Sequence, residues 1–106
     1  MHSSDSNVMY LKNQFLGLHM KNDENINNFI TRIDETAEKL MALGEDVKDS
    51  DKSLILIHGI PNQFNFIVIA IQEASKIKDY EHISNSLCNE EARQDEAYKG
   101  NSNLNS

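Results

Sequence analysis

The sequence has very little of several residue types, and each shortage excludes a class of protein. Cys88 is the only cysteine among 106 residues, so an internal disulfide and a four-ligand Cys/His zinc knuckle are both excluded. Lysine and arginine number 10 against 17 aspartates and glutamates, which gives a formal net charge of −7. Because affinity for a phosphate backbone comes mainly from clustered basic residues, this balance argues against a nucleic-acid-binding domain.

Long apolar stretches are also missing. No run approaches the roughly 20 apolar residues that a membrane-spanning helix needs. Residues 1–5 have neither the basic region nor the apolar region of a signal peptide. Together with the single cysteine, these features predict a cytoplasmic protein in a reducing compartment, with no membrane partner.

Residue patterns that support catalysis or cofactor binding are absent from the sequence. The four histidines do not have the spacing, to one another or to a glutamate, of a metal site on one helix face. The four glycines are isolated, so there is no glycine-rich phosphate loop. Cys88 falls on one apolar stripe with Tyr80, Ile83 and Leu87, where a thiol is usually inert packing. We therefore expect no catalytic residue, no metal and no cofactor.

Apolar residues do recur at helical spacing over the first half of the chain. A first helix is predicted over about residues 7–20. Its stripe consists of Val8, Leu11, Phe15 and Leu18, widened by Met9, Leu16 and Met20. A second, stronger stripe follows Asn25, which is a good N-cap. Gly44 stands where a C-terminal glycine would end that helix.

Three further helical segments follow. Asp49 or Ser50 can cap a third helix, which we expect to stop at Gly59. Residues 64–71 are apolar almost throughout, and a last helix is predicted over about residues 79–96. The chain therefore has the pattern of about five helices.

Two of these segments also fit buried strands. Residues 54–57 and 66–69 are rich in β-branched side chains, so periodicity alone does not separate helix from strand. Residues 59–62 between them can form a hairpin turn. A lone hairpin in a helical chain would leave two exposed edges, which favours helix. The predicted fold class is all-α, a small bundle of about five helices.

The ends of the chain differ from its middle in composition. Residues 1–6 and 97–106 are polar and offer too little apolar surface to offset the entropy lost on ordering. We expect a flexible N-terminus over 1–6, one helical domain over 7–96 and a disordered tail over 97–106. A domain this short buries a limited share of its surface, so partner subunits would add to its stability.

Several short motifs stand in a characteristic order along the chain. They are segment 10–21, which ends in Met20-Lys21; the helix start at 25–33; the Leu-Met-Ala-Leu-Gly junction at 40–44; the Asp-Ser-Asp segment 49–61, which closes in Gly59-Ile60-Pro61; Phe64 with Phe66-Ile67-Val68; and the closing segment 83–93. In this order and at these separations they resemble the capsid-like region of Gag polyproteins of copia-type LTR retrotransposons. The resemblance covers about residues 8–94.

The resemblance implies an all-helical, retroviral-capsid-like assembly domain, and it favours helix at 54–57 and 66–71. It carries over no catalytic residues, because that region of Gag is structural. Members of the family usually have more sequence ahead of this region and a downstream Cys-x₂-Cys-x₄-His-x₄-Cys knuckle that binds RNA, and this chain has neither. A polyprotein fragment, a degenerate copy and a host-retained short Gag all fit the sequence.

The function that these observations predict is structural: self-association as a Gag-type assembly domain. The expected partner is a second copy or a related Gag, in a weak homo-oligomer or a virus-like particle in the cytoplasm. The alternative is a helical interaction module that binds a different partner and has no role in a particle. Both hypotheses place the function on apolar residues. The candidates for core or assembly contacts are Phe29, Ile33, Leu40, Leu54, Leu56, Gly59, Pro61, Phe64, Phe66, Ile67 and Leu87.

The charge balance gives a first testable prediction, which concerns nucleic acid. With a net charge of −7 and no zinc knuckle, the chain should bind RNA only weakly at physiological salt. Filter binding should give a Kd above about 1 μM, the tight end of ordinary non-specific binding. A tighter Kd that weakens steeply with added salt would contradict the prediction.

Overall fold

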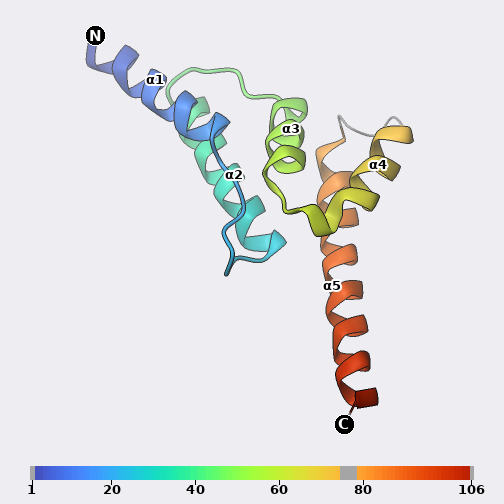
Figure 1. Cartoon of the computed structure of the whole chain (residues 1–106). Coiled ribbons are helices and arrows are strands. Elements are labelled where there is room, and N and C mark those ends of the chain that lie inside the picture. The colour runs from blue at the N-terminus through green and yellow to red at the C-terminus, as the bar shows by residue number, and fades with distance from the viewer. Residues whose placement is uncertain (1, 75–78, 106) are drawn as a thin grey trace.

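The computed structural model describes residues 2–74 and 79–105, and every regular element in that part is helical (Figure 1). The elements are α1 (His2–Leu16), α2 (Ile26–Ala42), α3 (Asp49–Gly59), the short 3₁₀ helix η1 (Asn62–Phe64), α4 (Asn65–Glu73) and α5 (Tyr80–Asn105). The all-α prediction is confirmed. The hairpin alternative is wrong, because residues 54–57 lie in α3 and residues 66–69 lie in α4.

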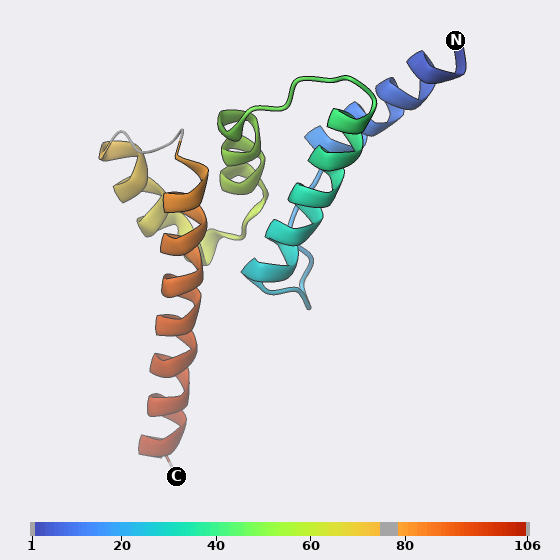
Figure 2. The ribbon, with the colours of Figure 1, turned by 180° about the vertical axis from the view of Figure 1, so that it is seen from behind.

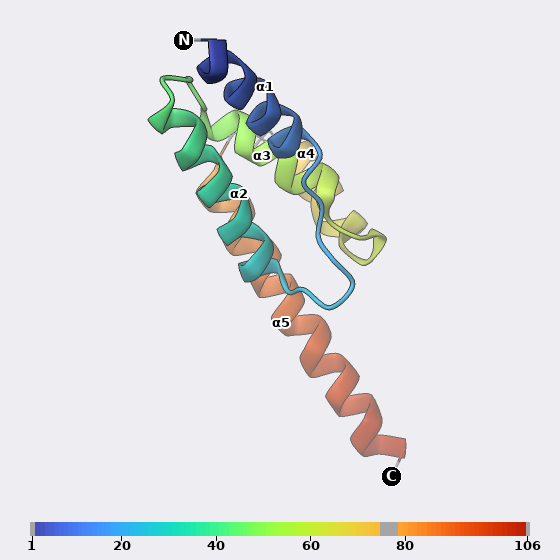
Figure 3. The same ribbon diagram turned by 90° about the vertical axis from the view of Figure 1, so that its left-hand side faces the viewer.

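Helix α3 occupies the middle of the molecule. The pair α1 and α2 lies on one side of it and the pair α4 and α5 on the other, as seen from the front and from behind (Figures 1 and 2). In the side view, α2 and α5 run along one side, while α1, α3 and α4 line the other (Figure 3). The second half of α5 extends beyond the other helices, and the molecule measures 63 × 30 × 17 Å. It is an elongated bundle.

Helix α2 begins and ends as the sequence predicts. The side chain of Asn25 accepts a hydrogen bond from the Asn28 amide at 2.8 Å, which satisfies an otherwise free donor of the first turn. At the other end Gly44 has a φ of 91°, and the amides of Gly44 and Glu45 bond to the carbonyls of Met41 and Leu40. This is a Schellman motif, which needs the left-handed conformation that glycine adopts without strain.

The core forms around the apolar stripe of α2. Phe29 and Ile33 are fully buried, and they belong to a core cluster that takes apolar side chains from every helix. The buried apolar residues are Phe15, Ile26, Phe29, Ile33, Ala37, Leu40, Ile55, Leu56, Ile57, Phe64, Ile71, Tyr80, Ile83 and Leu87. Helices α1, α3 and α5 pack on α2, and α4 joins the bundle through α5 and η1.

A close backbone contact joins α3 to α2 and to the segment that follows α1. A Cβ atom on Gly59 would lie 2.5 Å from Cζ of Phe29 and 3.0 Å from the carbonyl oxygen of Leu18. The Gly59 carbonyl also accepts a hydrogen bond from the Met20 amide at 2.8 Å. Only glycine fits at this crossing, so the end of α3 at Gly59 is set by packing as well as by the predicted break before Pro61.

Two helix boundaries inside the chain differ from the prediction. Helix α1 ends at Leu16 instead of continuing to residue 20, and Leu18 packs on the core from a non-helical segment. The N-cap of α3 is Lys48, not Asp49 or Ser50, because the carboxylate of Asp51 accepts a bond from the Lys48 amide at 3.0 Å.

The terminal helices are longer than the stripes that predicted them. Helix α1 starts at His2 and α5 runs to Asn105. The described residues of the two ends, 2–6 and 97–105, are therefore helical, whereas their polar composition predicts a flexible N-terminus over 1–6 and a disordered tail over 97–106. Residues 90–97, which lie almost wholly inside the predicted last helix, are rich in glutamate, alanine, arginine and glutamine, and these residues favour helix without any packing. The residues that follow them in α5 are polar and carry no such signal in the sequence.

Polar contacts attach the loops and α5 to α2. Arg32 donates two hydrogen bonds to the carboxylate of Glu24, both at 2.7 Å, and a third to the His19 carbonyl at 2.6 Å. This fork holds the pKa of Glu24 at about 2, below its ordinary value of 4.5, mainly through the Arg32 hydrogen bonds. On the other side, the Glu91 carboxylate of α5 accepts from the Ile26 amide at 3.1 Å, at the positive end of α2.

The predicted core gives a stability test. Phe29→Ala should lower the free energy of unfolding by about 3–5 kcal/mol, because Phe29 is fully buried against α3. In a domain this small such a loss leaves a large fraction unfolded, which circular dichroism melts will show. Phe66→Ala is the control: its side chain is 90% exposed, so stability should change by less than about 0.5 kcal/mol. A parent-like melt of Phe29→Ala would contradict the core assignment.

The Glu24–Arg32 fork gives a prediction about pH. The pKa of Glu24 is lower in the folded chain, so its stabilisation is present above about pH 4.5 and is lost as pH falls toward 2. Glu24→Gln should therefore cost about 1 kcal/mol at pH 6 and much less at pH 2.5. Glu38→Gln, at an exposed position of α2, is the control. Equal effects of Glu24→Gln at both pH values, measured by urea unfolding, would refute the prediction.

Candidate functional site: two apolar contact surfaces

The structure separates the predicted core or assembly residues into an inner and an outer group. Six of them are buried, namely Phe29, Ile33, Leu40, Leu56, Phe64 and Leu87. Gly59 and Ile67 are half-buried, and the exposed ones are Leu54, Pro61 and Phe66. The exposed group is therefore where a partner can bind, while the buried group holds the fold together.

The first exposed surface lies on α4. Phe66 is 90% exposed and Ile69, one turn further along, is 51% exposed, with Ala70 beside them. We name these three residues the α4 face. Ile67 and Val68 are half-buried against the core, and only Ile71 of α4 is buried. The helix therefore packs on α5 with one side and shows an apolar side to solvent.

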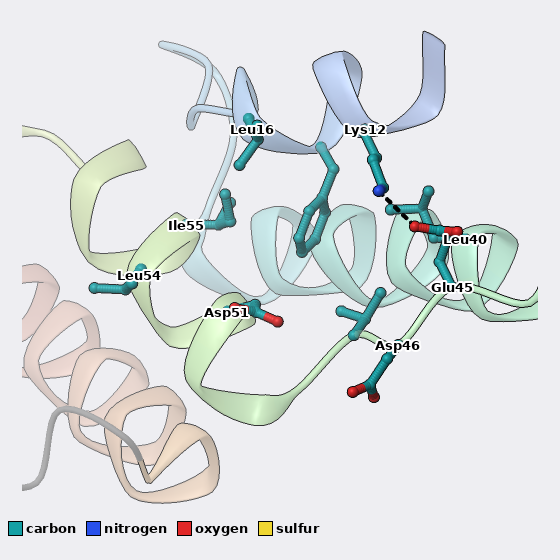
Figure 4. A pocket seen from close by; sticks show the side chains of 10 residues that line it. Lys12, Leu16, Leu40, Glu45, Asp46, Asp51, Leu54 and Ile55 are labelled. Carbon is teal, nitrogen blue, oxygen red and sulfur yellow. Dashed lines mark ion pairs between the residues drawn. The ribbon is translucent and has the colours of Figure 1, made fainter. Parts of the chain in front are cut away.

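The second surface is a groove between α1 and α3, with a volume of about 260 Å³ (Figure 4). Phe15, Leu40 and Ile55 form its floor from three different helices. Leu16 from α1 and Leu54 from α3 stand at its edge and are 70% and 46% exposed. We name this hollow the α1–α3 groove.

The rim of the α1–α3 groove is acidic. It carries the carboxylates of Glu45, Asp46 and Asp51 and one cation, Lys12. Lys12 forms an ion pair with Glu45 across the groove between α1 and the α2–α3 loop (Figure 4). The remaining carboxylates leave the rim with a negative potential.

Sequence reasoning placed Leu16 wrongly and missed the groove. The predicted apolar stripe of the first helix includes Leu16 and Met9, yet they are 70% and 62% exposed. The groove brings together segments 12–16, 45–47 and 51–55, and no periodicity within one helix relates them. Only the loop composition, with Glu45 and Asp46 before Val47, gave a local signal of an acidic edge.

Reactive side chains elsewhere are used for packing. The Tyr80 hydroxyl donates to Asp34 at 2.9 Å, and the ammonium of Lys52 lies 3.4 Å from the same carboxylate and over the Tyr80 ring. Burial and Asp34 raise the pKa of Tyr80, so it stays protonated. Burial also raises the pKa of the Cys88 thiol, which lies 3.2 Å from the side-chain oxygen of Asn27. Such a thiol is a weak nucleophile.

Residues 2–74 and 79–105 offer neither a cluster of metal ligands nor a single membrane-spanning helix. That part of the chain contains no group of three or more His, Cys, Asp or Glu side chains placed to hold a metal ion. It contains no single helix that is long and apolar enough to cross a membrane. Residues 49–59 and 62–73 reach that length and composition only when taken together across a 115° bend.

The fold and these surfaces define a small all-α domain. Its candidate functional sites are the α4 face and the α1–α3 groove, both of which are apolar contact surfaces. The family of gag-polypeptides of LTR copia-type matches residues 2–100. The chain belongs to this family of retrotransposon Gag proteins, whose domains are structural.

A curated relative agrees with this assignment. The chain is 23% identical over 90 residues to a retrovirus-related Pol polyprotein from transposon TNT 1-94 of Nicotiana tabacum. The match covers 84% of this chain and 7% of that polyprotein, so the chain spans a small part of the relative's length. No solved structure matches the chain.

Proposed function

We propose that this Gag domain is a non-catalytic assembly unit that acts by self-association, and that the α4 face makes the contact. The observation that carries the proposal is the exposure of Phe66, at 90%, on a helix that is apolar over residues 66–71. An apolar helix is normally enclosed by its own bundle or shared with a partner. Since its own bundle leaves the α4 face open, a partner is the remaining way to cover it.

Membership of the Gag family favours a second copy over an unrelated partner. Gag domains are structural, and a particle needs contacts between copies of one chain. Closed rings and open lattices both arise when one patch is used repeatedly. On the same reasoning, the proposed site of action is a virus-like particle within the cell.

The contact should be weak. Covering an exposed phenylalanine contributes about 1.5–3 kcal/mol, and the isoleucine beside it adds a similar amount at most. Losses of translational freedom and of side-chain freedom offset much of that gain. A Kd in the range of tens of micromolar or weaker follows, which allows assembly to be reversible.

Sedimentation velocity at rising concentration tests the proposal. The parent chain should form dimers or larger species from about tens of micromolar. Phe66→Gln should weaken association at least tenfold, because it removes the largest apolar group of the α4 face and keeps a good helix former. Tyr98→Gln is the matched control: Tyr98 is 74% exposed on α5, outside the α4 face, and its loss should change nothing. A parent chain that stays monomeric to millimolar concentration would overturn the proposal.

A further inference from the structure

We propose that the α4 face of one copy docks into the α1–α3 groove of a second copy, so that the contact runs head to tail. This inference rests on the self-association proposed above and names the surface that receives α4. The α4 face projects from the molecule, since Phe66 has only a tenth of its surface covered. A projecting aromatic side chain is best covered by a hollow, and the α1–α3 groove is such a hollow.

The sizes of the two surfaces agree. A dry cavity of about 150 Å³ lined by Leu, Ile and Phe side chains is large enough to bind benzene. The groove has about 260 Å³ over a floor of Phe15, Leu40 and Ile55, so it accommodates the Phe66 ring. Ile69, one helical turn beyond Phe66, then reaches the exposed edge formed by Leu16 and Leu54. Four exposed apolar side chains are covered by this one contact.

The charges are complementary as well. Phe66 is the second residue of α4, so seating its ring brings the positive end of the α4 dipole to the groove rim. That rim carries Asp46 and Asp51, whose carboxylates favour a helix N-terminus. The one charged residue of α4, Glu73, is at the far end of the helix, away from the acidic rim. The opposite orientation would place Glu73 against those carboxylates.

The groove cannot be filled by the α4 of its own chain. Helix α3 lies between the groove side of the molecule and α4, and α4 packs on α5 and η1 (Figures 1 and 2). The donor must therefore be a second copy. Because the two surfaces of the contact differ, a dimer still presents one free groove on one copy and one free α4 face on the other, and growth continues into rings or filaments.

Two variants, each defective in one surface, test the head-to-tail contact. Phe66→Gln removes the α4 face and leaves the groove intact. The double variant Leu16→Gln, Leu54→Gln weakens the groove edge and leaves α4 intact; both leucines are exposed, so the fold is retained. Each variant alone should associate at least tenfold more weakly than the parent. An equimolar mixture should recover the parent's Kd and stop at a 1:1 dimer, because the remaining surfaces are both disabled.

The outcomes separate this inference from the function on which it rests. If the groove variant associates like the parent while Phe66→Gln does not, α4 binds another surface; self-association stands and the head-to-tail contact is wrong. If both variants fail alone and the mixture also fails, the complementary contact is again wrong. If neither variant changes the parent's association, or the parent does not associate, the role of the α4 face is wrong too. Circular dichroism melts of both variants confirm that they are folded.

Discussion

The rest of the structure depends on the close approach of α3 to α2 at Gly59. A Cβ atom at this position would lie 2.5 Å from the ring of Phe29, so the two helices reach this distance only because residue 59 has no side chain. The Met20 amide binds the Gly59 carbonyl at the same crossing, which also fixes the segment after α1. One crossing thus sets the relative positions of α1, α2 and α3, and these three helices supply most of the walls of the α1–α3 groove.

The other half of the molecule is attached through the buried side chains of Ile83 and Leu87 on α5 and through polar contacts. The Glu91 carboxylate bonds the first turn of α2, and Tyr80, Asp34 and Lys52 join the start of α5 to α2 and α3. These contacts hold α5 along α2, and α4 packs on α5 with its buried side. Helix α4 consequently lies on the far side of α3 from α1 and α2 (Figure 1), and the α4 face is exposed to solvent. Two complementary surfaces at different places on one rigid unit are the geometric requirement for a contact that propagates.

Much of this fold could be predicted from the sequence because its signals are local. Asn25 and Gly44 act at their own helix ends, and the stripe through Phe29 and Ile33 is buried as predicted. The placement of Leu16 and Leu18 could not be predicted, because their helical spacing continues past the point where α1 ends at Leu16. The groove could not be predicted from the sequence either, because it depends on the distance between α1 and α3. That distance is set by the close contact at Gly59 and not by any local sequence pattern.

The net charge of −7 constrains how copies of the chain can meet. Two such copies repel each other at long range, and at physiological ionic strength this repulsion fades beyond about 8 Å. Association must then come from short-range apolar burial at a surface with little charge of its own.

The α4 face meets this condition, because Phe66, Ile69 and Ala70 stand on a helix with one charged residue at its far end. The groove meets it differently, because its floor is apolar and its acidic rim favours a helix N-terminus over an acidic segment of the chain. In the proposed contact, charge would select the orientation and apolar burial would supply the free energy.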